Sequence, residues 1–426
     1  MIPMSTTARE HLRLRVLARL EEHQQRVGER DADAVREIIR QVVDEYGTDA
    51  QRGIRPPLGN PDRMCAELDR SFLRAGPFTK YFDGDVAVDE VLAFRETISA
   101  ITSDGSVIVD DEAASEAEML AIVTRLLAEA DAAIDVKNPI VVTQIWQNRV
   151  RASVSVPPAA DCLDAAFRVY QLRDSSLPQL VEWNSLTSPA ANFLAAVQQG
   201  RTGVLVSGAP GSGKTTLASA LLRALPATTI VRLVQEVREL DVSHLMGGRW
   251  MPASGHTIRS MVARALQFAT SYLVVSETLG AEAYELLKAA NSGCGFLTTL
   301  HADSAPEAMD SLVGAALMAG ENVPASQVRH AFARLIDVVV HCEAEPLHLV
   351  QPGQRRRRQV MEIATVPPQL SNDQFTLESL FRRERLGDPL EYCGPNALAE
   401  LARKLDRCLP AGVSSVGLCD GSVRVL

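Results

Sequence analysis

The stretch Gly208-Ala209-Pro210-Gly211-Ser212-Gly213-Lys214-Thr215 matches the phosphate-loop pattern G-x-x-x-x-G-K-S/T. It follows an apolar run, Val204–Val206, and precedes a helix-like stretch, Thr215–Leu225, that ends at Pro226. The motif needs this order of strand, loop and helix, because its backbone N–H groups must point together at phosphate oxygens. The sequence therefore predicts a site for a nucleoside triphosphate at this loop.

Two side chains at the end of the motif have distinct expected tasks. Lys214 is expected to reach the β- and γ-phosphates, and the hydroxyl of Thr215 is expected to bind magnesium. The expected cofactor-binding stretch runs from Gly208 to Thr216. The predicted ligand is ATP with Mg²⁺.

From about residue 191, short apolar runs alternate with helix-like stretches. Alternating β and α segments predict a mostly parallel sheet with helices on both faces. The chain is therefore expected to be an α/β protein with a C-terminal RecA-like P-loop ATPase domain at residues 191–426, ending in a β-ribbon at 343–385 and a helix at Ala397–Leu409. The expected strands are Gly203–Ser207, Thr229–Val234, Tyr272–Ser276, Gly295–Leu300 and Val338–Cys342.

The N-terminal part has a different pattern. Residues 1–82 are predicted to form a helical extension, because apolar residues recur at helical spacing in His11–Val27 and Asp31–Tyr46. Residues 83–172 are predicted to form a smaller α+β domain, PAS-like, with a hairpin near 97–109, a helix at Ser115–Ala130 and strands at 139–143 and 149–156. Residues 173–190 contain Pro178 and Pro189 and are expected to be a linker.

Composition narrows the class of protein. The formal net charge of −10 argues against nucleic acid as the main partner. The seven cysteines form no C-x-x-C pair, which is typical of reduced thiols, and the first residues lack a secretory signal pattern. No run of 18 apolar residues exists, so a cytoplasmic protein is expected. The basic run Arg355–Arg358 is interpreted as a solvated hairpin tip, with a patch for an anionic partner as the alternative.

Several polar residues after apolar runs are candidates for the chemistry of the site. Glu277 ends the run Tyr272–Ser276, where a P-loop enzyme places an acid for the metal or its water. Glu236 and Glu239 follow another expected strand and could polarise water, and Glu236 is the one expected to orient it. His301 could sense the γ-phosphate. The alternatives are solvated surface carboxylates and a structural histidine.

The order of these motifs resembles that of the secretion-superfamily ATPases of type II and type IV systems. The similarity is greatest to the tight-adherence (Tad) pilus branch, the CpaF/TadA-like ATPases. It covers about residues 86–385 and is strongest over 200–305. The motifs that carry it, besides the phosphate loop, are Gln235–Leu240, Ser276–Gly280, Ala283–Gly293 and Thr298–Ser304.

The resemblance implies a ring of six two-domain subunits at the cytoplasmic side of the inner membrane, where membrane platform proteins of a pilus or secretion system are the partners. It also implies that arginines complete the nucleotide site. Arg149 and Arg168 fall where the N-terminal domain supplies them, and Arg259 matches a further family arginine. Arginine suits this task because its planar group binds phosphate at two points.

The chain departs from the family pattern at three places. Gln235 stands where the family has an acid assigned to water activation, Ser276 stands where it has glycine, and Leu266–Ser271 lacks the usual arginine. These changes leave two alternatives to a hydrolysing motor open. One is a conjugation-type DNA-transfer ATPase of the same superfamily, and the other is a nucleotide-binding assembly or regulatory subunit with little hydrolysis.

Overall fold

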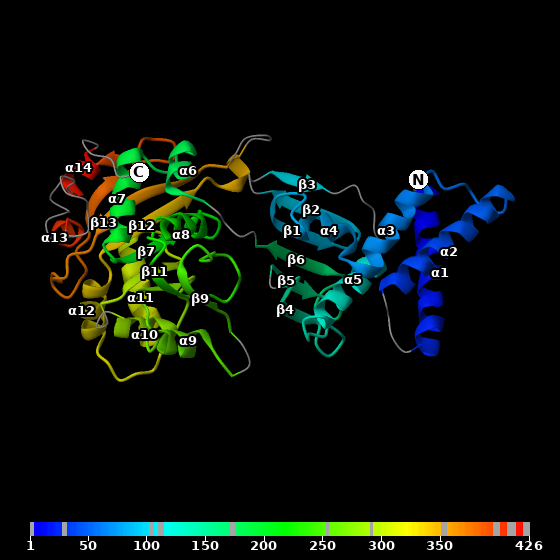
Figure 1. The fold of residues 1–426 in the computed structure, drawn as a ribbon, viewed down its shortest axis with the longest axis horizontal. Helices are drawn as coiled ribbons and strands as arrows, with labels where there is room; N and C mark the ends of the chain where they lie inside the picture. The colour runs from blue at the N-terminus through cyan, green and yellow to red at the C-terminus, as the bar shows by residue number, and fades with distance from the viewer. Residues whose placement is uncertain are drawn as a thin grey trace. The chain divides into compact units, whose positions relative to one another are not determined.

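The computed structural model describes residues 4–27, 32–102, 106–109, 115–147, 149–170, 175–252, 255–289, 293–350, 356–394, 401–406 and 415–420. The chain forms two compact units, Met1–Gln171 and Leu172–Leu426, which we call unit 1 and unit 2 (Figure 1). Each unit contains its own sheet, and each is described by itself.

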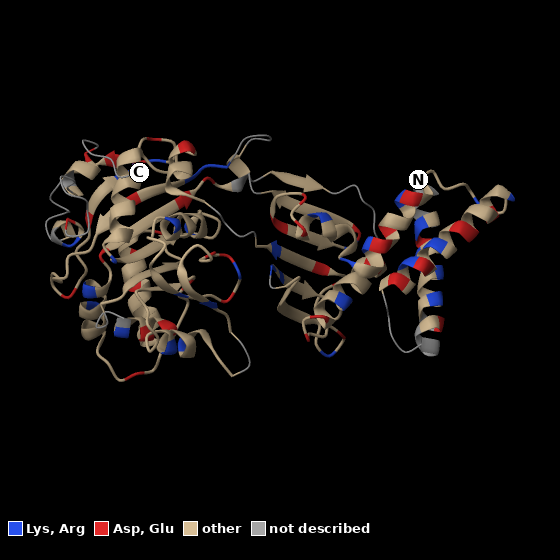
Figure 2. Cartoon of the chain, in the orientation of Figure 1, with Lys and Arg blue, Asp and Glu red and all other residues tan. Residues whose placement is uncertain are grey.

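Unit 1 begins with three helices that share an apolar core. Both predicted amphipathic helices are confirmed, and positive and negative residues are interspersed along them (Figure 2). The Glu45 carboxylate accepts hydrogen bonds from Arg15 and Arg19, which joins the first two helices. The helices are α1 (Met4–Val27), α2 (Ala32–Gln51) and α3 (Pro61–Leu73).

The rest of unit 1 is an antiparallel six-stranded sheet in the order β3-β2-β1-β6-β5-β4. One face of the sheet packs on α5 (Glu116–Ala128) and on the short helices η1 (Gly76–Phe78) and α4 (Thr79–Phe82). The expected hairpin near 97–109 is present as β2 and β3, while the division of unit 1 at residues 82 and 83 stays a prediction. The strands are β1 (Val88–Phe94), β2 (Thr97–Thr102), β3 (Val107–Val109), β4 (Ile140–Ile145), β5 (Val150–Ser155) and β6 (Asp164–Val169).

The described part of the expected linker, residues 175–190, is largely helical. It contains α6 (Leu177–Glu182) and the first turn of α7 (Ser188–Gln199). The side chains of Ser176 and Gln179 form a reciprocal cap at the start of α6, and Leu177 is buried in the core of unit 2. The two prolines that suggested a linker occupy the first turns of these helices, where a missing N–H costs nothing.

Unit 2 contains a nine-stranded sheet in the order β15-β14-β13-β12-β7-β11-β10-β8-β9. The strands from β12 to β9 in this order are parallel, and β13 to β15 run antiparallel beyond them. All five expected strands are confirmed as β7, β8, β10, β11 and β12, whereas β9 was not predicted because two glycines interrupt its apolar pattern. The strands are β7 (Gly203–Gly208), β8 (Ile230–Val234), β9 (Met246–Trp250), β10 (Tyr272–Val275), β11 (Gly295–Leu300), β12 (Val338–Ala344), β13 (Arg358–Thr365), β14 (Glu378–Arg382) and β15 (Glu391–Tyr392).

Helices cover both faces of this sheet, as predicted. One apolar core packs α6, α7 and α8 on one face, and a second packs α9 to α12 on the other. Part of the expected final helix lies outside the described residues, and its described part is α13. The remaining helices are α8 (Lys214–Arg223), α9 (Ile258–Ala265), α10 (Glu282–Ala289), α11 (Ala305–Leu317), α12 (Ala325–Leu335), η2 (Leu347–Leu349), α13 (Leu401–Leu405) and α14 (Ser415–Cys419).

In the described part of the chain, no helix combines the length and the apolar character needed to cross a membrane.

Candidate functional site

The phosphate loop joins β7 to α8 and is built on three glycines with positive φ. Gly208, Gly211 and Gly213 have φ of 146°, 74° and 100°, values that glycine adopts with little strain. A Cβ on Gly208 would lie 2.2 Å from the carbonyl oxygen of Cys342 and 2.6 Å from Oγ of Ser212. Any other residue would therefore force the loop away from β12, and the loop keeps an open cradle of backbone at the N-terminus of α8.

Lys214 lies against this cradle with only 7% of its surface exposed. Its Nζ donates to the carbonyl oxygens of Gly208 at 2.8 Å and Ala209 at 3.0 Å. The same nitrogen lies 3.0 Å from Nδ1 of His301. A held ammonium beside a helix N-terminus favours an anion at this place, so the residues present fit the phosphates of a nucleotide.

Thr215 contacts an acid from the loop after β8. Its hydroxyl donates to Oε2 of Glu239 at 2.9 Å. Glu236, the residue to which we assigned water orientation, is exposed on the same loop, and the structure brings Glu239 rather than Glu236 to Thr215. Sequence spacing could not separate the two acids, because the path of an irregular loop decides which one faces the phosphate loop.

Gln235 explains the path of that loop. Its side chain is fully buried, and its Oε1 accepts hydrogen bonds from the backbone N–H of Glu239 at 3.3 Å and of Leu240 at 3.1 Å. Its Nε2 donates to the carbonyl oxygen of Leu240 at 3.4 Å. The amide therefore holds the backbone that carries Glu239.

Glu277 and His301 form the second polar pair of the site. Oε1 of Glu277 lies 2.8 Å from Nε2 of His301, and both side chains are more than a third exposed. Nδ1 of His301 lies 3.0 Å from Nζ of Lys214 and 3.3 Å from the carbonyl oxygen of Gly208. His301 thus links the acid after β10 to the lysine of the phosphate loop.

Threonine hydroxyls hold the turn that carries Glu277 against β11. Thr299 Oγ1 donates to the carbonyl oxygen of Ser276 at 2.7 Å. Thr298 Oγ1 donates to the carbonyl oxygen of Val275 at 2.9 Å and lies 2.7 Å from the hydroxyl of Thr278. Because hydrogen bonds lie on both sides of Glu277, its backbone is fixed while its side chain stays accessible.

A buried histidine under the loop was not predicted. His341 of β12 is 5% exposed, and its Nδ1 lies 3.0 Å from the hydroxyl of Ser207 on β7. Burial lowers the pKa of His341 below its ordinary value, and the carboxylates of Glu343 and Glu362 offset only part of this effect. A polar residue that follows the apolar run Val338–Val340 was the available signal in the sequence.

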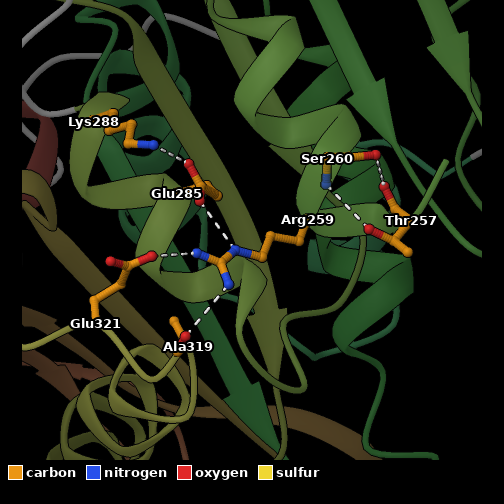
Figure 3. Close-up of polar contacts among 7 residues, drawn as sticks. All are labelled: Thr257, Arg259, Ser260, Glu285, Lys288, Ala319 and Glu321. Atoms are coloured by element: carbon orange, nitrogen blue, oxygen red, sulfur yellow. Dashed lines mark hydrogen bonds and ion pairs between the residues drawn. The ribbon is translucent and has the colours of Figure 1, made fainter.

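Arg259 contacts acidic residues of the helical face instead of the phosphate loop (Figure 3). Its Nε donates to Glu285 at 3.1 Å, and its Nη2 donates to Glu321 at 2.9 Å. Lys288 also binds Glu285. Burial acts to raise the pKa of Glu285, but the hydrogen bonds from Lys288 and Arg259 outweigh it and leave the pKa lowered. The structure therefore shows Arg259 in an ion-pair network that joins α9 to α10.

Arg149 and Arg168 belong to unit 1, and their assignment to the nucleotide site stays a prediction. Arg168 of β6 is exposed and lies opposite Arg151 of β5 in the sheet register. Arg149 directly precedes β5.

The residues near the phosphate loop also fit a magnesium ion that receives some of its ligands from a bound nucleotide. Among the described residues, no group of three or more His, Cys, Asp or Glu side chains is arranged as a metal site. Mg²⁺ in nucleotide enzymes needs no such group, because phosphates and water supply most of its ligands. The hydroxyl of Thr215 and the carboxylates of Glu239 and Glu277 are the oxygen ligands available here.

The model of the family described as type II/IV secretion system protein matches residues 115–373. The type IV secretion system protein PtlH of Bordetella pertussis is 32% identical over 188 residues, which are 40% of this chain and 52% of that protein. A putative conjugal transfer protein of Mycobacterium tuberculosis is 28% identical over 228 residues, or 51% of this chain and 61% of that protein.

The chain thus spans about half the length of the first of these relatives. The X-ray structure of the Legionella pneumophila ATPase DotB has a similar fold, with a TM-score of 0.50 and 18% identity over 70% of this chain and 80% of that one. The family match covers more than half of the chain and includes the loop, both acids and the histidine. The chain therefore belongs to the type II/IV secretion system protein family.

Proposed function

We propose that this chain binds ATP with Mg²⁺ and hydrolyses it, as a motor that powers a type II or type IV secretion system or a Tad-type pilus. The observation that carries the proposal is the gathering of Lys214, Thr215 with Glu239, and Glu277 with His301 around one phosphate loop. These residues come from the carboxyl ends of β7, β8, β10 and β11, where α/β sheets bind their ligands.

The binding half of the site consists of the loop and Lys214. The backbone of residues 208–213 offers N–H groups to the phosphates, and Lys214 supplies a positive charge within the same cradle. Mg²⁺, when bound, would neutralise charge on the phosphate oxygens. The oxygen atoms of Thr215, Glu239 and Glu277 would hold it or its water.

The hydrolytic half consists of two accessible carboxylates. The carboxylate of Glu277 contacts Nε2 of His301, and Nδ1 of the same ring contacts Lys214, so the ring orients Glu277 at the phosphate loop. A carboxylate near the phosphate can accept a hydrogen bond from water and orient it for attack. Glu239 takes the place that we expected Glu236 to fill. Gln235 cannot act as a base, and its side chain instead holds the backbone of the loop.

Coupling of hydrolysis to movement rests on unit 1 and on neighbouring subunits. We propose that Arg149 and Arg168 close on the nucleotide in a ring of six subunits at the cytoplasmic face of the membrane, with platform proteins as partners. Arg168 is exposed on β6, where the sheet register places it between Arg151 of β5 and Glu90 of β1. Figure 2 shows the basic residues on this sheet.

A DNA-transfer ATPase is the second candidate, favoured by the similarity to a putative conjugal transfer protein. Direct DNA binding would require many phosphate contacts and fall steeply with salt. A DNA-binding titration at increasing salt separates the candidates, since tight binding at physiological salt would favour DNA transfer.

The test of the main proposal is steady-state ATP turnover of the full chain. We expect Lys214→Ala to lower turnover by about a hundred-fold or more, because one charge in direct contact with the phosphates is lost. Lys288→Ala is the matched control, because Lys288 binds Glu285 on the helical face, and it should keep turnover within about two-fold. Light scattering should show hexamers for both variants. Unchanged turnover in Lys214→Ala would overturn the assignment of the site.

A further inference from the structure

The arginine run that follows β12 reaches the phosphate loop. Arg356, Arg357 and Arg358 are described, and Arg355 lies outside the described residues. Arg356 and Arg358 are partly buried, whereas Arg357 is exposed. The interpretation of this run as a solvated hairpin tip therefore applies to Arg357 but not to its two neighbours.

The contacts of these arginines alternate along the chain. A Cβ placed on Gly211 would lie 3.2 Å from Nη1 of Arg356, and one on Gly213 would lie 3.6 Å from Cβ of Arg358. Side chains two residues apart share a face of an extended segment. Arg356 and Arg358 are consequently on the side of the phosphate loop, and Arg357 is on the other side.

Glu345, which directly follows β12, contacts Arg356 and Arg357 through different groups. Its carboxylate accepts hydrogen bonds from Nε of Arg357 at 3.2 Å and from Nη2 at 2.6 Å. Its backbone carbonyl oxygen accepts from Nε of Arg356 at 2.6 Å. One edge of the Arg356 guanidinium is thus held by the ribbon, which directs Nη1 over Gly211.

We infer that Arg356 binds the diphosphate part of the nucleotide within its own subunit. The inference rests on the proposed function and adds a residue to it. Backbone N–H groups of the loop would surround the β-phosphate of a bound nucleotide, so a guanidinium beside Gly211 would lie near the same group. Arginine is suited to this position because its planar fork binds two phosphate oxygens while another edge keeps its hydrogen bond to the ribbon.

The test is calorimetric titration of the full chain with MgADP and, separately, with AMP. We expect Arg356→Gln to weaken MgADP binding by about ten- to hundred-fold, the effect of losing one charge-assisted hydrogen bond. Arg357→Gln is the matched control from the same run, and it should change the affinity by no more than about two-fold, because its charge is directed at Glu345. The affinity for AMP should change by the same factor in Arg356→Gln and in Arg357→Gln.

The outcomes separate this inference from the proposed function. If wild type binds MgADP, Lys214→Ala abolishes binding and Arg356→Gln binds like wild type, the inference is wrong and the proposed function stands. Equal weakening by Arg356→Gln and Arg357→Gln would also overturn it, since general charge would then explain the effect. Failure of wild type to bind MgADP would overturn both. If Arg356→Gln does not fold, Arg356→Lys takes its place in the titration. Thermal unfolding of Arg356→Lys and of wild type, both without nucleotide, shows whether the two proteins are equally stable.

Discussion

In the loop after β8, Gln235 and Glu239 have different roles. An acid was expected at position 235, and a glutamine there raised doubt about hydrolysis. The buried amide instead binds the backbone of Glu239 and Leu240, and Glu239 reaches Thr215. A glutamine is suited to this place because it offers both an acceptor and a donor, whereas a carboxylate offers only acceptors.

Replacing Gln235 by glutamate is therefore expected to harm the fold and not to raise activity. A carboxylate oxygen would face the carbonyl oxygen of Leu240, which now accepts from Nε2. We expect Gln235→Glu to lower the free energy of unfolding by about 1–3 kcal/mol, the cost of an unsatisfied buried polar group. Urea unfolding and ATP turnover measure the two effects, with Glu236→Gln as the stability control on the exposed neighbouring position. A large gain in turnover would instead support a regulatory subunit with little hydrolysis.

Among the secondary-structure elements, strand pairing places the polar residues of the site close to the phosphate loop. β7 lies between β11 and β12, so the phosphate loop, the histidine after β11 and the buried His341 of β12 share one region of the sheet. The apolar strands and the loop were predictable because their signals are local. The hydrogen bond between Thr215 and Glu239 and the nearness of Arg356 to Gly211 were not predictable, because each depends on the path of a loop distant in sequence.

The buried His341 predicts a dependence of stability on pH. The folded protein resists protonation of His341 because its pKa is lowered, whereas the unfolded chain takes up a proton below about pH 6.5. The unfolded state then binds more protons, so the free energy of unfolding should fall as the pH drops below that value, by at most about 1.4 kcal/mol per pH unit.

Urea unfolding from pH 5 to pH 8 measures this dependence, and His341→Asn is the variant that removes the titrating group. Below pH 6.5, the free energy of unfolding should change less steeply with pH in His341→Asn than in wild type. Above pH 7, residue 341 should contribute no pH dependence in either protein. Identical slopes in the two proteins would show that His341 does not titrate differently on folding.

In the whole molecule, unit 2 contains most of the proposed nucleotide site, and unit 1 contains the two arginines proposed to complete it. The loop, Glu239, Glu277, His301 and Arg356 all belong to Leu172–Leu426. Arg149 and Arg168 belong to the other unit, and the ring that would bring them to a nucleotide comes from the family resemblance. Sequence alone could name these arginines only through that resemblance, because nothing local distinguishes a phosphate-binding arginine from a surface one.

We propose that the loop, the acids and the histidine form one hydrolytic site, and the variant Glu277→Gln separates hydrolysis from nucleotide binding there. Steady-state ATP turnover of this variant is measured beside its affinity for MgATP. We expect turnover to fall by about a hundred-fold or more, while the affinity for MgATP changes by less than about ten-fold, because Lys214 and the loop remain intact. Turnover equal to that of wild type at full nucleotide occupancy would contradict it.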